Sequence, residues 1–202
     1  MGTTTNNCAA AVEPRLAVID TETNYENEVM SIGIVIAHAQ TYQIIDERYY
    51  ILTPEYTTPS MFGGALLIHS DRKAYKRSDA IADLRALLQK NNVENLFAYN
   101  AKFDYHNLPE LQDFAWHDIM RVAAYRQYNP CIPEDAECCS TGRLKRNYSV
   151  EAITRMLTKN KTYFEKHNAV YDARDELRIM QLLGHPSELS LIHISEPTRR
   201  TP

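Results

Sequence analysis

The sequence predicts an α/β fold built on a mixed sheet of five strands, three antiparallel strands followed by parallel strands, and flanked by helices. The first third of the chain contains three apolar or alternating runs separated by polar turns, as in an antiparallel meander. The middle alternates short apolar runs with segments of helical spacing, which indicates parallel crossovers. The last part carries helical patterns only. With 202 residues, 44% of them hydrophobic, the chain can bury one core.

The antiparallel strands are expected at residues 16–20, 29–37 and 42–52. A polar turn at residues 24–27 separates the first two strands, and Pro54 ends the third. Pro59, Gly63 and Gly64 then mark a loop.

In residues 71–90 apolar side chains, Tyr75 among them, recur at helical spacing with charges between them, which predicts an amphipathic helix. Residues 96–99 and 115–119 are short apolar runs, and we expect them to form the two parallel strands. A helix starting near Phe103 connects them.

Three further helices are predicted in the second half, at residues 120–128, 149–157 and 168–183. Asn129 and Pro130 stop the first, Ser149 caps the second, and Gly184 closes the third. Residues 131–147 between them form an irregular insertion.

The composition and the terminal segments indicate the domain organisation and the general kind of protein. We expect residues 1–13 to be a disordered lead, residues 14–186 to be one domain, and residues 187–202 to be a non-native tail. No run approaches the roughly 18 apolar residues of a membrane span, so we expect a cytoplasmic protein without membrane contact. The four cysteines do not form a secreted disulfide framework. A net charge of −4 argues against a broad grip on duplex DNA but does not exclude a nuclease.

Acidic residues follow the ends of three predicted elements. Asp20 and Glu22 end the first strand, where alternation directs both carboxylates to one face. Asp104 falls in the first turn of the helix after the fourth strand, and Asp172 in the first turn of the last helix. His167 lies just before that helix. Asp20 and Glu22 thus offer two hard oxygen donors on one face, and the acidic residues together occupy the ends of three elements.

These motifs resemble the DEDDh branch of the DnaQ-like 3′-to-5′ exonucleases, in the ribonuclease H-like superfamily. Residues 18–23 match the first motif of the family, residues 100–104 the second, and His167 with Asp172 five residues later the third. The resemblance covers residues 16–183.

The chain departs from the family at two positions, Tyr99 where many members have histidine and Asn24 where many have glycine. Neither position is a metal ligand of the family.

The resemblance implies a ribonuclease H-like fold and a metal-dependent exonuclease that releases nucleoside 5′-monophosphates from the 3′ end of single-stranded or short DNA or RNA. Two divalent ions, Mg²⁺ or Mn²⁺, are expected on Asp20, Glu22, Asp104 and Asp172, with His167 as general base. Charge supports this expectation, because four converging carboxylates repel one another and a phosphodiester unless cations neutralise them.

Six residues are expected to contact the substrate: Thr21, Thr23, Leu66, His69, Asn100 and Phe103. Apolar and aromatic side chains in this set can line a pocket for the terminal base, as can Phe62. Core packing is at least an equal alternative for Leu66, His69 and Phe62 and the favoured one for Phe103. Helix capping is an alternative for Asn100.

Other hypotheses stay open. The chain can be a nucleic-acid-binding module that keeps this fold without turnover, or an RNA-trimming enzyme similar to oligoribonuclease. Cys131, Cys138 and Cys139 with His117 are a weak zinc candidate, because their spacing matches no paired zinc motif. Arg143, Lys145 and Arg146 form a short cationic patch for phosphates or a solvated loop. The sequence identifies no polymerase partner and no oligomeric state.

Overall fold

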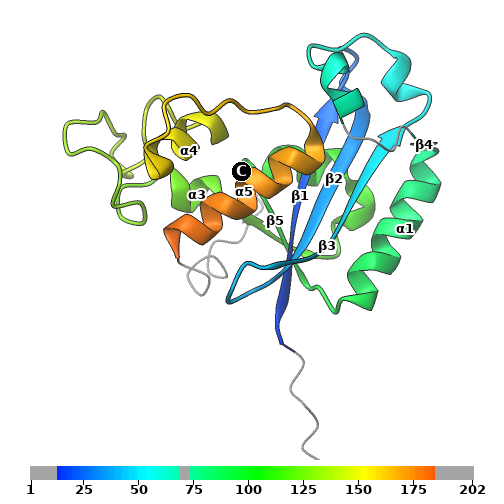
Figure 1. Cartoon of the computed structure of the whole chain (residues 1–202), viewed down its shortest axis with the longest axis horizontal. Coiled ribbons are helices and arrows are strands. Elements are labelled where there is room, and N and C mark those ends of the chain that lie inside the picture. The colour runs from blue at the N-terminus through cyan, green and yellow to red at the C-terminus, as the bar shows by residue number, and fades with distance from the viewer. Residues whose placement is uncertain (1–12, 69–72, 185–202) are drawn as a thin grey trace, which may run out of the picture.

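The structure, a computed structural model, describes residues 13–68 and 73–184. Its two central strands, β1 (Arg15–Thr23) and β2 (Val29–His38), are buried along most of their length. Such continuous burial requires that helices cover both faces of the sheet, and Figure 1 shows α1 on one side and α5 on the other. Most of the predicted lead, His69 and the predicted tail lie outside the described residues.

The sheet in the described residues has six strands in the order β4-β3-β2-β1-β5-β6. The four outer strands are β3 (Ile44–Leu52), β4 (Ala74–Tyr75), β5 (Asn95–Ala98) and β6 (Ala115–Asp118). β1 to β3 form an antiparallel meander, whereas β5 pairs parallel to both β1 and β6. The predicted mixed sheet is therefore confirmed, with antiparallel strands followed by parallel ones.

Helices divide into two layers, one on each face of the sheet. The helices are α1 (Arg77–Lys90), α2 (Lys102–Asn107), α3 (Met120–Ala123), α4 (Val150–Thr158) and α5 (Ala169–Leu183). Short 3₁₀ turns lie at Glu55–Thr57, Gly63–Ile68 and Pro109–Leu111. Leu84 of α1 packs with Ile19 on one face, and Val170 of α5 packs with Val18 on the other. Alternation along β1 thus assigns successive residues to different cores.

The start of α5 lies against β2 at Gly33. A Cβ atom at this glycine would be 2.1 Å from the backbone carbon of Ala169, so only glycine allows the contact. Because α5 begins at Ala169, this close approach fixes the first turn of α5 beside the central strands.

Two sequence predictions are wrong in detail. Ala74 and Tyr75 belong to a sixth strand and not to the amphipathic helix, since they pair with the end of β3 and the Tyr75 ring packs edge-on against Tyr50. The helix predicted at residues 120–128 ends at Ala123. The next carbonyl, that of Ala124, accepts the amide of Leu144 at 2.9 Å, so a contact distant in sequence replaces the continuing helix.

The remaining helical predictions are confirmed. The hydroxyl of Ser149 accepts the amide of Ala152 at 3.2 Å and caps α4, and Gly184 ends α5 with a φ of 68°. Residues 131–147 contain no helix or strand, only isolated bridges. Within the described parts of the chain, no helix is both long and apolar enough to cross a membrane.

Candidate active site

The carboxyl end of β1 supplies the first two acids of the site. Asp20 and Glu22 are half-buried and lie on the sheet face that α5 covers, as alternation predicted. Thr21 lies between them and is directed to the opposite face. The pairing of β1 with β2 changes register between Glu22 and Thr23, so the strand becomes irregular directly after the acidic pair.

Asp104 approaches from α2 and is held by β1. It is 1% exposed, and the hydroxyl of Thr21 donates a hydrogen bond of 2.8 Å to its Oδ1 atom. Thr21, predicted to bind substrate, is thus buried and holds a carboxylate. Asn100 does not cap α2, because Ala101 is the N-cap residue and has no side-chain cap. Asn100 instead forms the turn from β5 with a φ of 61°.

Asp172 and His167 come from the start of α5 and the segment before it, at the same end of the sheet as the end of β1 (Figure 1). Ligand atoms of Glu22, His167 and Asp172 all lie within 4.8 Å of one another. In the residues that the structure describes, this is the only such group of potential metal ligands.

The imidazole of His167 is held in place from one side. Its ring stacks on Phe62, with ring centroids 3.7 Å apart and planes inclined by 13°. His167 itself has a φ of 52°, and the next residue, Asn168, donates from its side-chain amide to the carbonyl of Ala65 at 2.9 Å. Two contacts therefore join the segment before α5 to the loop that carries Phe62.

Burial raises the pKa of every acid in the site. The pKa of Glu22 and that of Asp104 rise to about 7, and that of Asp172 to about 8, with desolvation as the largest cause in each case. Desolvation also raises the pKa of Asp20 well above its ordinary value, and the neighbouring carboxylates raise it further. By contrast, burial lowers the pKa of His167, so its ring is mostly neutral at pH 7.

These residues fit divalent metal ions. The Oδ1 atom of Asp172 is buried and has no hydrogen-bond partner among the described residues, so it is an acceptor that a cation could satisfy. Asp20 and Asp104 lie outside the tight group of three ligands. Both are nevertheless close to other acids of the site, because Glu22 and Asp172 raise the pKa of Asp20, and Asp104 raises the pKa of Asp20 and of Glu176. Oxygen donors of this kind are the ligands that Mg²⁺ and Mn²⁺ prefer.

Two further acids at the site were not predicted. Glu165 raises the pKa of both Glu22 and Asp172, and its own pKa rises to about 7. Glu176, on α5, is 2% exposed and is the neighbouring charge with the largest effect on the pKa of Asp20. Glu176 follows Asp172 by four residues, and that helical spacing was the only sequence signal that could have identified it.

The predicted substrate-binding residues separate into different environments. Phe103 is 45% exposed and lines a surface pocket on α2 with Asn100, Lys102, His106 and Asn107, so the expectation of core packing for Phe103 is wrong. Leu66 is 3% exposed and packs as a core residue. Thr23 is half-buried at the irregular end of β1, and His69 lies outside the described residues.

The predicted zinc candidate does not assemble, since no cysteine takes part in the one ligand group found in the described residues. Cys131 is exposed, and His117 is buried, with its Nε2 atom 2.8 Å from Oδ1 of Asn95. Arg143 of the cationic patch lies over the ring of Tyr148 at 5.4 Å.

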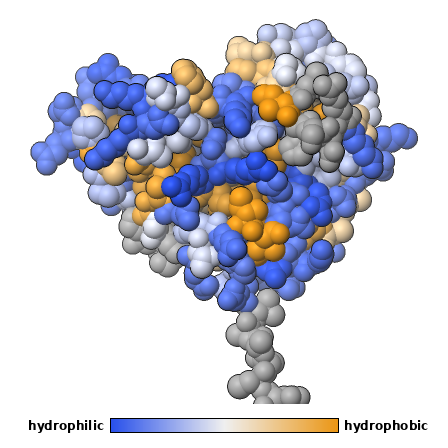
Figure 2. Space-filling model, in the orientation of Figure 1, coloured by the Kyte–Doolittle hydropathy of each residue, from blue (hydrophilic) through white to orange (hydrophobic). Residues whose placement is uncertain are grey.

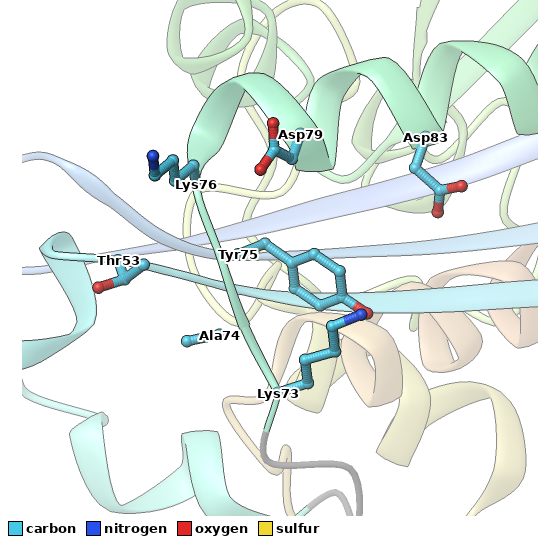
Figure 3. Close-up of a pocket in the computed structure, with 7 residues that line it drawn as sticks. All are labelled: Thr53, Lys73, Ala74, Tyr75, Lys76, Asp79 and Asp83. Carbon is cyan, nitrogen blue, oxygen red and sulfur yellow. The ribbon is translucent and has the colours of Figure 1, made fainter.

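A second pocket lies where β4 meets α1 (Figure 3). Two of its charged groups contact partners within the protein: Lys73 lies 4.8 Å from the ring centroid of Tyr75, and Asp83 accepts the hydroxyl of Tyr50 at 2.8 Å. The face drawn in Figure 2 is mostly hydrophilic, with apolar side chains in separate groups. Neither feature competes with the acidic centre as a catalytic site.

The chain has a ribonuclease H-like α/β fold, with carboxylates gathered near the end of its first strand. No family model and no curated protein matches the chain. Comparison of structures finds many matches. The nuclease domain of 3′hExo, a DEDDh family member bound to rAMP, is 15% identical with a TM-score of 0.60, covering 92% of this chain and 98% of that one.

Two other solved structures extend the comparison. A 3′-exonuclease that recognises a histone mRNA stem-loop has a TM-score of 0.62 at 15% identity. The match covers 89% of this chain and 66% of the exonuclease chain. E. coli ExoI, in a zinc-bound complex with single-stranded DNA, has a TM-score of 0.57 at 14% identity. The match covers 89% of this chain but only 42% of the length of ExoI. The chain therefore has the fold of the DEDDh 3′-exonucleases, as the sequence motifs predicted.

Proposed function

We propose that the protein is a metal-dependent 3′-to-5′ exonuclease that hydrolyses single-stranded or short nucleic acid to nucleoside 5′-monophosphates. The observation that carries the proposal is the meeting of Glu22, His167 and Asp172 within 4.8 Å, beside the half-buried Asp20 and the buried Asp104. All five residues predicted from the motifs thus lie at one end of one sheet. Structures with this fold include exonucleases that were solved with single-stranded DNA or with rAMP.

Asp20, Glu22, Asp104 and Asp172 are the residues that would hold the metal. Two divalent ions bound there, Mg²⁺ or Mn²⁺, would supply the charge that polarises a water molecule and stabilises the leaving oxygen. The chain itself keeps these acids desolvated, which strengthens their interaction with cations.

His167 is the proposed general base. Its neutral ring can accept a proton from the attacking water near pH 7, because burial holds its pKa below the ordinary value. The stacked Phe62 ring limits the orientations that the imidazole can adopt.

The pocket on α2 supports a contact with the substrate strand. Phe103 presents an exposed ring on which a base can stack, and the exposed Lys102 adds a positive charge beside it. Aromatic stacking does not depend on base identity, so this pocket suits a strand of any sequence.

A double variant, Asp104→Asn with Asp172→Asn, tests the proposal. We expect it to lose hydrolysis of a short single strand, in Mg²⁺ and in Mn²⁺, while it keeps its fold. Hydrolysis that survives both substitutions would contradict the two-metal proposal. A wild-type protein that binds single strands but hydrolyses neither DNA nor RNA would favour a binding module of the same fold.

A further inference from the structure

Glu176 is a buried carboxylate without an assigned role. It is 2% exposed, and no ion pair within the described parts of the chain includes it. Burying a carboxylate costs several kcal/mol unless hydrogen bonds or cations compensate. Its position makes the cost larger, because Asp104 and Asp172 lie close enough to raise its pKa. An apolar side chain would fill this position without the free-energy cost of burying a carboxylate, so packing alone does not explain Glu176.

The hydrogen bond of Glu176 points to its role. Its Oε2 atom accepts the backbone amide of Tyr99 at 3.0 Å, across 77 residues of sequence. Tyr99 directly follows β5. The contact therefore joins α5, which carries Asp172, to the turn that leads into α2 and Asp104.

A second carboxylate holds the next amide of the same turn. Asn100 donates its backbone amide to Oδ1 of Asp118 at 3.0 Å, and Asn100 has the left-handed φ of 61°. Consecutive amides, those of Tyr99 and Asn100, are thus each held by a buried acid from a different element, α5 and β6. Two such contacts fix the direction in which the chain leaves β5 and enters α2.

We propose that Glu176 is a positioning residue of the metal centre, which fixes Asp104 relative to Asp172 by joining the turn between β5 and α2 to α5. This inference rests on the proposed exonuclease function. Thr21 holds the Asp104 carboxylate directly, at 2.8 Å, whereas Glu176 acts one step away, through the backbone that carries Asp104. Groups that orient metal ligands in this way commonly change metal affinity or activity by about 10–100-fold when they are replaced.

Two substitutions separate this role from packing. Glu176→Gln keeps an oxygen that can accept the Tyr99 amide, and Glu176→Ala removes it. For Glu176→Ala we expect kcat to fall at least about tenfold at saturating Mn²⁺, with KM for a single-stranded oligonucleotide within about twofold of wild type. Glu176→Gln should keep most of kcat. Arg178→Ala, an exposed position on the same helix, is the control and should match wild type.

The second measurement is the rise in Tm on addition of Mn²⁺, which does not require turnover. We expect wild type and Glu176→Gln to show a large rise and Glu176→Ala a much smaller one. The inference is overturned if Glu176→Ala keeps both its kcat and its Mn²⁺ response, or if Glu176→Gln loses as much as Glu176→Ala. An inactive wild-type protein would instead contradict the proposed exonuclease function itself.

Discussion

In the presence of chelator the protein should lose stability as the pH rises from 5 to 8, and Asp172→Asn should remove part of that loss. The pKa of Asp172 is raised from 3.8 to about 8, first by desolvation and then by Glu165 and Glu22. The folded state therefore binds this proton more tightly than the unfolded state does. The stability that the proton contributes is complete below pH 3.8 and is lost as the pH rises through 8.

The size of the effect follows from proton linkage. Between pH 5 and pH 7 the unfolded Asp172 has released its proton and the folded one has kept it. One retained proton changes the free energy of unfolding by about 1.4 kcal/mol for each pH unit, or about 2.7 kcal/mol over this interval. Asparagine at position 172 has no such proton, so the variant should gain stability relative to wild type by this amount.

Urea unfolding of both proteins at pH 5, 6, 7 and 8 in EDTA measures the difference. We expect Asp172→Asn to become progressively more stable than wild type as the pH rises. Adding Mn²⁺ at pH 8 should reverse the order, because the ion stabilises only a site that retains its ligand. A stability difference that does not change with pH, or a wild type that is the more stable protein at pH 8 in EDTA, would refute the reasoning.

Three other substitutions have defined outcomes. Thr21→Val removes the buried donor that orients Asp104, and because the loss of such a group commonly lowers activity by about 10–100-fold, we expect kcat to fall by about tenfold in steady-state assays. Gly33→Ala places a Cβ atom 2.1 Å from the backbone of Ala169, so we expect at least about 2 kcal/mol of destabilisation by urea unfolding. Phe103→Ala should weaken oligonucleotide binding by about 1–3 kcal/mol in a titration with Ca²⁺, while Tm stays unchanged, because this ring is 45% exposed.

Each of these substitutions has a matched control. Thr21→Ser keeps the hydroxyl and should keep kcat, whereas equal losses in both Thr21 variants would show that the hydrogen bond is not the cause. A Cβ atom at Gly64 meets no atom of the described residues within 4 Å, so Gly64→Ala should be neutral. Phe103→Tyr keeps the ring, and weak binding by this variant would argue against stacking.

The acidic centre could be predicted from sequence because its residues occupy the ends of elements. Asp20 and Glu22 share a face through strand alternation, and Asp172 lies in the first turn of a helix whose end Gly184 marks. Such local rules depend only on neighbouring residues. They placed acids at the ends of separate elements, and the resemblance to the DEDDh exonucleases predicted which of these acids form one site.

The features that the sequence analysis did not predict depend on contacts between residues far apart in sequence. In the sequence Glu176 cannot be distinguished from an ordinary acidic residue of a helix. Its role depends on the backbone amide of Tyr99, the residue that follows β5. The stack of Phe62 on His167 joins two loops that no periodicity relates. The two-residue strand at Ala74 forms because it pairs with the end of β3. The helical spacing of apolar residues in the same segment predicted a helix there instead.

We propose that this acidic centre removes nucleotides from a 3′ end with the help of metal ions. The most direct measurement is release of mononucleotides from 3′-labelled single-stranded DNA and RNA, in Mg²⁺, in Mn²⁺ and in EDTA, for wild type and His167→Ala. We expect labelled nucleoside 5′-monophosphate from wild type with either ion, little in EDTA and little from His167→Ala. Absence of release from both polymers in either metal, or equal release by His167→Ala, would contradict it.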